Sequence, residues 1–132
     1  MMREALTQRV GGLAEAVIAD SRWEQDDLSV SVLGMLLYGF ALATGRIAMF
    51  LDIEDINAVV FECVTQKTGA AESWTKGLVA EAAASAFDKA HHSGQYELIG
   101  VGHSYFTVED QATVVDNVFA NIANVRLAAN RA

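Results

Sequence analysis

Residues 28–43, LSVSVLGMLLYGFALA, form a long apolar run without a charge, and acidic segments lie on both sides of it. A run this apolar must be removed from water, either inside a membrane or at the centre of a protein core. A membrane-spanning helix needs about 20 apolar residues, whereas runs of about 10–14 are typical of buried helices. Ser29 and Ser31 near its start, and flanks that are acidic instead of basic, favour the central helix of a soluble domain.

Amphipathic periodicities on both sides of this run predict the helices that cover it. Over residues 2–20 and 52–68, apolar side chains recur every three or four positions, as on one face of an α-helix. Alanine-rich residues 70–92 predict another helix, and T-V-E-D at Thr107 matches a capping box that would open the last one. The glycine-rich residues 94–106 break the periodicity, which predicts an irregular segment, with a short buried helix as the alternative. The predicted inward residues are Leu6, Val10, Leu13, Val17, Ile56, Val59, Val60, Cys63, Val64, Trp74, Leu78, Ala82, Phe87, Val115, Val118, Phe119, Ile122 and Val125.

These patterns predict an all-α fold, with a single domain over residues 1–132 and about five helices around the central helix 28–43. The chain contains no proline, the residue that most often interrupts long helices. The two glycines inside the central run predict places where a neighbouring helix approaches its backbone. Asp26 or Asp27 is expected to cap the N-terminus of this helix.

The charge of the chain favours a basic partner. Acidic residues outnumber basic ones by 17 to 9, for a net charge of −8, and the basic residues are spread along the chain. An anionic nucleic acid is therefore a poor partner, whereas a basic protein would be attracted. Acidity that only keeps the protein soluble is the alternative. The lone cysteine and the charged first twenty residues, which lack a signal-peptide core, predict a cytoplasmic protein.

The residues that could carry chemistry do not form a catalytic or metal-binding pattern. His91 and His92 are adjacent, so on a helix they would point about 100° apart, and His103 has no histidine partner three or four positions away. Gly100-Val101-Gly102 lacks the third glycine of a dinucleotide-binding turn. Cys63 lies on an apolar stripe, as an inert core thiol would. We therefore predict no catalytic residue, no metal and no cofactor.

Two sets of polar residues are candidates for binding a partner. Acidic segments flank the central run and its apolar extension, and up-and-down packing would bring both to one end of the bundle if residues 45–51 carried the chain back. Three asparagines at spacings of four and three follow the apolar face of the last helix, although asparagine is a mediocre helix former. A polar boundary bonded to neighbouring loops is the alternative for these amides. The candidate partner-binding residues are Glu24, Asp26, Asp27, Asp52, Glu54, Asp55, Asn117, Asn121 and Asn124.

Taken together, these features predict a small acidic helical protein that docks a basic protein partner, without membrane or nucleic-acid binding. A bacterial immunity protein or antitoxin that neutralises a cationic toxin is its concrete form. One alternative is a ligand-binding or enzymatic bundle with residues 94–106 as a lid, and another is a homodimer formed through the last helix. The residues expected around a ligand pocket are Tyr38, Trp74, Tyr96, His103 and Tyr105.

Overall fold

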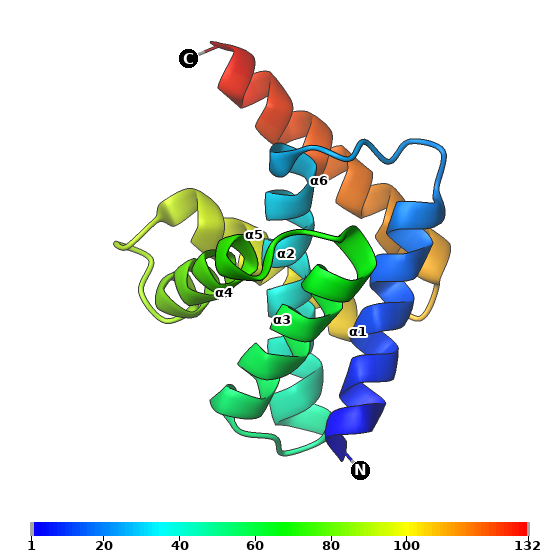
Figure 1. Cartoon of the computed structure of the whole chain (residues 1–132), viewed down its shortest axis with the longest axis vertical. Helices are drawn as coiled ribbons and strands as arrows, with labels where there is room; N and C mark the ends of the chain where they lie inside the picture. The colour runs from blue at the N-terminus through cyan, green and yellow to red at the C-terminus, as the bar shows by residue number, and fades with distance from the viewer. Residues whose placement is uncertain (1, 132) are drawn as a thin grey trace.

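The computed structural model describes residues 2–131, and every regular element in that range is helical, as the sequence predicts (Figure 1). There are six α-helices between these residues, and one of them forms in the segment that was predicted to be irregular. In chain order the elements are α1 (Met2–Ala19), α2 (Asp27–Ala43), the π-helical turn η1 (Thr44–Ala48), α3 (Ile53–Thr68), α4 (Glu72–Ala86), α5 (Ser93–Ser104), the 3-10 turn η2 (Tyr105–Thr107) and α6 (Gln111–Arg131).

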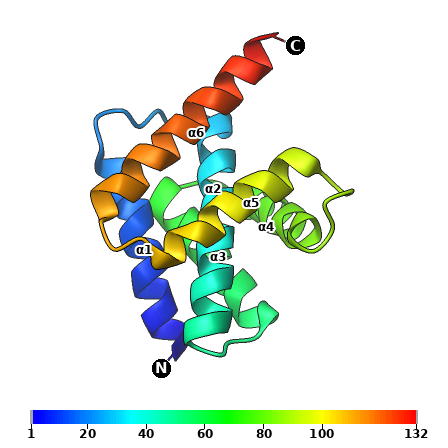
Figure 2. The ribbon, with the colours of Figure 1, turned by 180° about the vertical axis from the view of Figure 1, so that it is seen from behind.

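Helix α2 runs through the middle of the molecule with the other helices around it (Figures 1 and 2). All of its residues from Ser29 to Ala43 are buried except Ser31. Its N-cap is Asp26, whose carboxylate accepts the backbone N–H of Ser29 at 2.8 Å. The helical stretch Asp27–Ala48 is long and apolar enough to cross a bilayer, but 89% of its most apolar window is buried by the rest of the protein. Packing among helices therefore accounts for the composition of this run.

Helices α2 and α5 cross in direct backbone contact, and glycines make the contact possible. A Cβ atom at Gly39 would lie 1.9 Å from the carbonyl oxygen of Ile99, and one at Gly102 would lie 2.0 Å from that of Leu36. Any larger residue would push the two helices apart. The prediction of an irregular segment at 94–106 is therefore wrong, because these residues form α5 and the start of η2, as the alternative of a short helix has it. Of the glycines in this segment, Gly102 is the one that serves helix packing.

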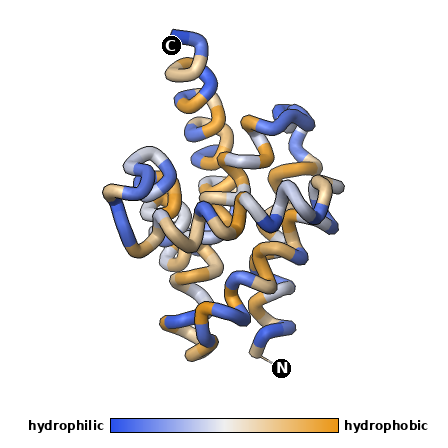
Figure 3. Tube along the Cα trace, turned by 60° about the vertical axis from the view of Figure 1, so that its left-hand side comes forward, coloured by the Kyte–Doolittle hydropathy of each residue, from blue (hydrophilic) through white to orange (hydrophobic). Residues whose placement is uncertain are grey.

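Two other boundaries also differ from the sequence prediction. Helix α4 ends at Ala86, so Phe87 lies beyond the helix and is 57% exposed instead of pointing inward. Thr107 belongs to η2, and α6 is opened by Asp110, whose carboxylate accepts a backbone N–H from its first turn. The inward sets predicted for α1 and α3 are buried as expected. Figure 3 shows the resulting separation, with apolar positions inside and hydrophilic ones in the connections.

Candidate functional site

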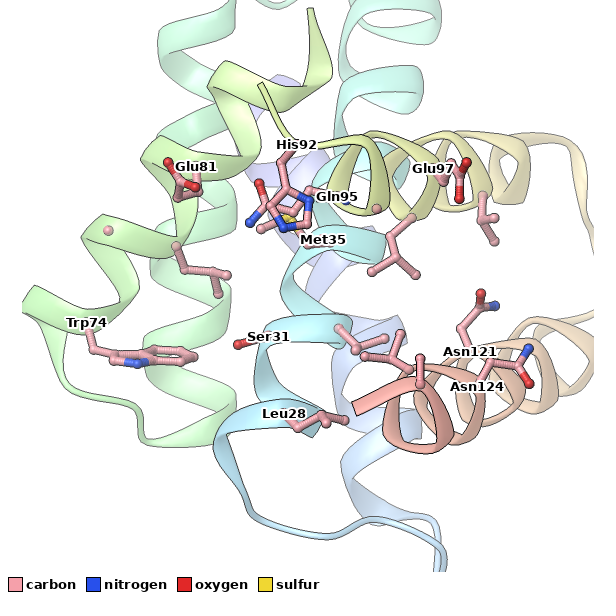
Figure 4. A pocket seen from close by; sticks show the side chains of 18 of the residues that line it. Leu28, Ser31, Met35, Trp74, Glu81, His92, Gln95, Glu97, Asn121 and Asn124 are labelled. Atoms are coloured by element: carbon pink, nitrogen blue, oxygen red, sulfur yellow. Dashed lines mark hydrogen bonds between the residues drawn. The ribbon is translucent and has the colours of Figure 1, made fainter. Parts of the chain in front are cut away.

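A groove of about 880 Å³ opens where α4, α5 and α6 surround one edge of α2 (Figure 4). Its floor comes from α2 and its walls from the other three helices. This volume lies in the range of sites that bind small molecules. We call it the α2 groove, defined by Leu28, Val32 and Met35 on the floor and by Trp74, Leu98 and Asn124 on the walls.

At one end of the α2 groove, α4 and α5 converge and their polar side chains hold one another. The Glu81 carboxylate pairs with Nε2 of His91 at 3.0 Å, and this contact lowers the pKa of Glu81 below its ordinary value. Nδ1 of His92 accepts the backbone N–H of Gln95 at 3.1 Å and so caps α5. The Gln95 side-chain oxygen accepts the hydroxyl of the buried Ser85 at 2.6 Å. These bonds fix the join between the two helices.

Other polar groups along the α2 groove remain free to bind. Among residues 2–131, the side chains of Ser31, Glu97 and Asn124 form no hydrogen bond within the protein. No lysine or arginine among residues 2–131 lines the groove. Two carboxylates, those of Glu81 and Glu97, do line it. The groove is therefore apolar inside and negative at its rim.

The two acidic segments do not meet. Asp26 lies at the start of α2 and Asp52 lies beyond its far end, so the two carboxylates sit at opposite ends of the molecule (Figure 1). The expectation that packing brings the segments together is wrong, because η1 stays at the end of α2 where the chain leaves it. The 17 residues of α2 alone separate the segments by about 25 Å.

Each acidic segment also caps a helix and forms ion pairs. Asp26 accepts from Arg126 at 3.0 Å, and Glu24 lies 3.5 Å from the same guanidinium. The pKa of Asp26 is lowered, first by the backbone N–H and the hydroxyl of Ser29 and then by Arg126. Asp52 caps α3 by accepting the N–H of Asp55 at 2.9 Å. The remaining carboxylates differ: Asp55 lies 3.6 Å from Arg3, while Asp27 and Glu54 occupy first helical turns.

The asparagine stripe of α6 divides into a structural part and a part that faces the α2 groove. Asn117 accepts the hydroxyl of Tyr105 at 2.6 Å, and Asn121 donates to the backbone oxygen of Asn117 at 2.8 Å. Asn121 and Asn124 line the groove and point toward it (Figure 4). Asn117 therefore has the structural role that was the alternative for these amides, a polar boundary bonded to a neighbouring segment. Asn124 is available to a ligand.

Most of the residues expected around a ligand pocket lie elsewhere. Tyr38 is fully buried and donates to the Oδ1 atom of Asn57 at 2.6 Å, and burial raises its pKa to about 12. Tyr96 and His103 are exposed outside the α2 groove. Of the five expected residues only Trp74 lines it. Sequence reasoning did not identify the floor residues Leu28, Val32 and Met35. They are spaced four and three apart, but this stripe does not stand out because nearly every position of the run is apolar.

A second candidate surface lies where the chain leaves η1. Phe50 has a left-handed backbone with a φ of 56°, and its side chain is 88% exposed. Ile47, three positions earlier, is 54% exposed, and the acidic start of α3 follows directly. We call this surface the Phe50 corner, defined by Ile47, Phe50, Asp52, Glu54 and Asp55. It lies at the end of the molecule opposite the connection between α1 and α2 (Figure 1).

Neither surface contains a metal-ligand set. Within residues 2–131 no group of three or more histidine, cysteine or acidic side chains is placed to hold a metal ion. Cys63 is buried, and this burial raises the pKa of its thiol to about 11. The thiol is therefore protonated near neutral pH and is a poor nucleophile.

Comparison with known proteins gives no relative from which a role could be transferred. No protein family, no curated protein and no solved structure matches the chain. The function is therefore inferred from the geometry and charge of the α2 groove and the Phe50 corner.

Proposed function

We propose that the protein binds a basic protein partner and that the Phe50 corner is the surface that contacts it. The observation that carries the proposal is the state of Phe50, which is 88% exposed and has a φ of 56°. A left-handed backbone costs a bulky residue free energy, and helices usually use glycine at such a position. Strain of this kind is characteristic of functional positions.

The composition of the Phe50 corner suits a protein interface. Aromatic side chains that enter a pocket on the partner supply much of the binding energy, and a polar rim around them excludes water. Phe50 and Ile47 would form the apolar centre, and Asp52 and Glu54 would form part of the rim. Arg3 offsets part of the charge of Asp55, so Asp52 and Glu54 are the acids that we expect to face the partner.

The net charge of −8 supports a basic partner, because complementary charge speeds association and disfavours acidic competitors. The acids near Arg126 lie at the far end of the molecule and would add to the long-range field instead of touching the same surface. A bacterial immunity protein or antitoxin bound to a cationic toxin remains the concrete form of this proposal. A cytoplasmic location and a homodimer through α6 stay predictions.

Photo-crosslinking tests the proposal directly. Phe50 is replaced by p-benzoylphenylalanine in cells that carry the gene naturally, and the crosslinked protein is identified by mass spectrometry. The matched control places the same group at Leu127, which is 55% exposed on the last turns of α6. We expect a basic protein to be captured at position 50 and not at position 127. An acidic partner, equal capture at both positions, or a crosslink between two copies of this chain would overturn the proposal.

Binding kinetics with the purified captured partner then separate the two contributions. Phe50→Ala should speed dissociation by about 30-fold or more if the side chain is a dominant anchor. The double change Asp52→Asn and Glu54→Gln should mainly slow association, and the effect should shrink at high salt. An unchanged dissociation rate for Phe50→Ala would contradict the anchoring role.

A further inference from the structure

We infer that the α2 groove is a separate binding site for a small apolar molecule that carries an amine in its ammonium form. The groove is concave, with α2 beneath it and walls from α4, α5 and α6 (Figure 4). Because α4 and α5 converge at Glu81, His92 and Gln95, one end of the groove is closed. A compact molecule fits this shape better than a partner's helix, which would have to leave the groove at both ends.

The interior of the α2 groove is apolar and held in place by the core. Met35 and Val32 on the floor are 3% and 2% exposed, on the most buried helix of the fold. The wall formed by α5 is fixed by the backbone contact between Gly102 and Leu36. A groove with such supports exists before a ligand arrives, so little of the binding free energy is lost in ordering it.

The polar groups of the α2 groove select the charge of the ligand. Its described lining has no lysine or arginine that could hold an anion, whereas Glu97 presents a carboxylate without a protein partner. Asn124 adds an amide oxygen on α6, the neighbouring wall, whereas Trp74 lies across the groove on α4, where its indole ring adds to the apolar lining (Figure 4). An ammonium group would find these acceptors, and a carboxylate would be repelled by Glu97.

The fluorescence of Trp74 reports on this site without a label. The chain has two tryptophans, and Trp23 lies in the connection before α2, so Trp23→Phe leaves Trp74 as the sole emitter. The probes are 1-adamantanamine, 1-adamantanemethanol and 1-adamantanecarboxylate at pH 7, which share one apolar cage and differ in their polar group. We expect saturable binding of the amine, weaker binding of the alcohol, and a carboxylate affinity lower than that of the amine by about tenfold or more.

Glu97→Gln tests the origin of the selectivity. It should reduce the preference for the amine over the alcohol severalfold while the alcohol binds as before. Equal affinities of amine and carboxylate in the parent protein would overturn the assignment of the ligand class. No saturable change with any of the three probes up to their solubility limits would overturn the site itself.

Two glycines provide a matched pair that separates binding in the groove from binding elsewhere. A Cβ atom at Gly77 or at Gly100 would meet no other atom within 4 Å, so a side chain can start at either position without a clash. Gly77 lines the α2 groove and Gly100 lies outside it on α5. Gly77→Leu should abolish binding of the amine, and Gly100→Leu should leave it unchanged, with the Met35 methyl resonance as a second readout. Binding that survives Gly77→Leu would refute the site, whereas crosslinking at position 50 tests the partner proposal independently.

Discussion

Replacing Phe50 by glycine is expected to stabilise the protein, although the change removes a large apolar side chain. Phe50 has a φ of 56° and is 88% exposed. A left-handed conformation costs a non-glycine residue about 1–2 kcal/mol. Glycine avoids that cost but loses about 0.5–1 kcal/mol more backbone entropy on folding. Because so little of the ring is buried, its removal costs only about 0.3 kcal/mol of the roughly 1.5–3 kcal/mol that full burial supplies.

The comparison of glycine with alanine isolates the backbone contribution, since both variants lose the same ring. Phe50→Ala keeps the unfavourable conformation, so the glycine variant should be more stable than the alanine variant by about 1 kcal/mol. In a chain of this size that difference corresponds to a melting temperature about 3–5 °C higher. Urea unfolding followed by circular dichroism at 222 nm measures it, provided that the two variants have equal m-values.

A position with ordinary helical backbone serves as the control. At Gly100, in α5, the order should reverse, and alanine should be more stable than glycine by up to about 1 kcal/mol. If Phe50→Gly is no more stable than Phe50→Ala, the left-handed conformation does not strain the backbone in solution. Backbone strain would then give no reason to assign Phe50 a binding role.

Three further predictions concern the core. Gly39→Ala and Gly102→Ala should each lower the free energy of unfolding by about 3 kcal/mol or more, because the added methyl group would lie 1.9 Å or 2.0 Å from a backbone oxygen. Gly100→Ala is the control. Unfolding midpoints of the two variants that are no lower than that of the control would contradict the backbone contact between α2 and α5. Cys63, whose pKa burial raises to about 11, should react with dithionitrobenzoate at pH 8 about 100-fold more slowly in the folded protein than in guanidinium, and equal rates would show that the thiol is accessible. Burial raises the pKa of Tyr38 from 10.0 to about 12, so between these pH values the folded state keeps a proton that the unfolded chain loses. The contribution of this proton to the free energy of unfolding is complete below pH 10 and is lost as the pH rises to about 12. Urea titrations across this range should show a shallower decline for Tyr38→Phe than for the parent, and parallel declines would refute the assignment.

The fold was largely predictable because most helices carry their burial pattern in the sequence. Amphipathic spacing located α1 and α3, and the apolar run located α2. Residues 94–106 were predicted wrongly because glycine has two opposite effects. It lowers helix propensity by about 1 kcal/mol, and it also lets two backbones meet. Gly39 was identified as a point of close approach, but only the three-dimensional structure pairs it with the segment around Gly102.

The candidate surfaces were less predictable, because they depend on where the chain goes after α2. Bringing the acidic segments together would have required residues 45–51 to cross about 25 Å, close to the reach of seven fully extended residues. The π-helical turn Thr44–Ala48 occupies four of those positions instead, so the segments stay apart. Nothing in the spacing of Phe50 marks it as exposed, since it lies within the apolar residues 47–51 and has the pattern of a core residue. Its role depends on a backbone angle that local sequence does not determine.

Helix α2 stabilises the fold and also forms the floor of the α2 groove, which Gly77 lines from α4. The edge formed by Leu28, Val32 and Met35 is the floor of the α2 groove, and Gly77 lines the same groove with space for a Cβ atom, which would meet no other atom within 4 Å. Leucine is also a better helix former than glycine by roughly 0.7 kcal/mol. Gly77→Leu should therefore raise the melting temperature, through both helix propensity and the apolar surface it covers, while it closes the groove. An unchanged or lower melting temperature would show that the space is not open in solution. If the temperature rises and amine binding disappears, the glycine keeps a site open at the expense of stability, as the left-handed Phe50 does at the other surface.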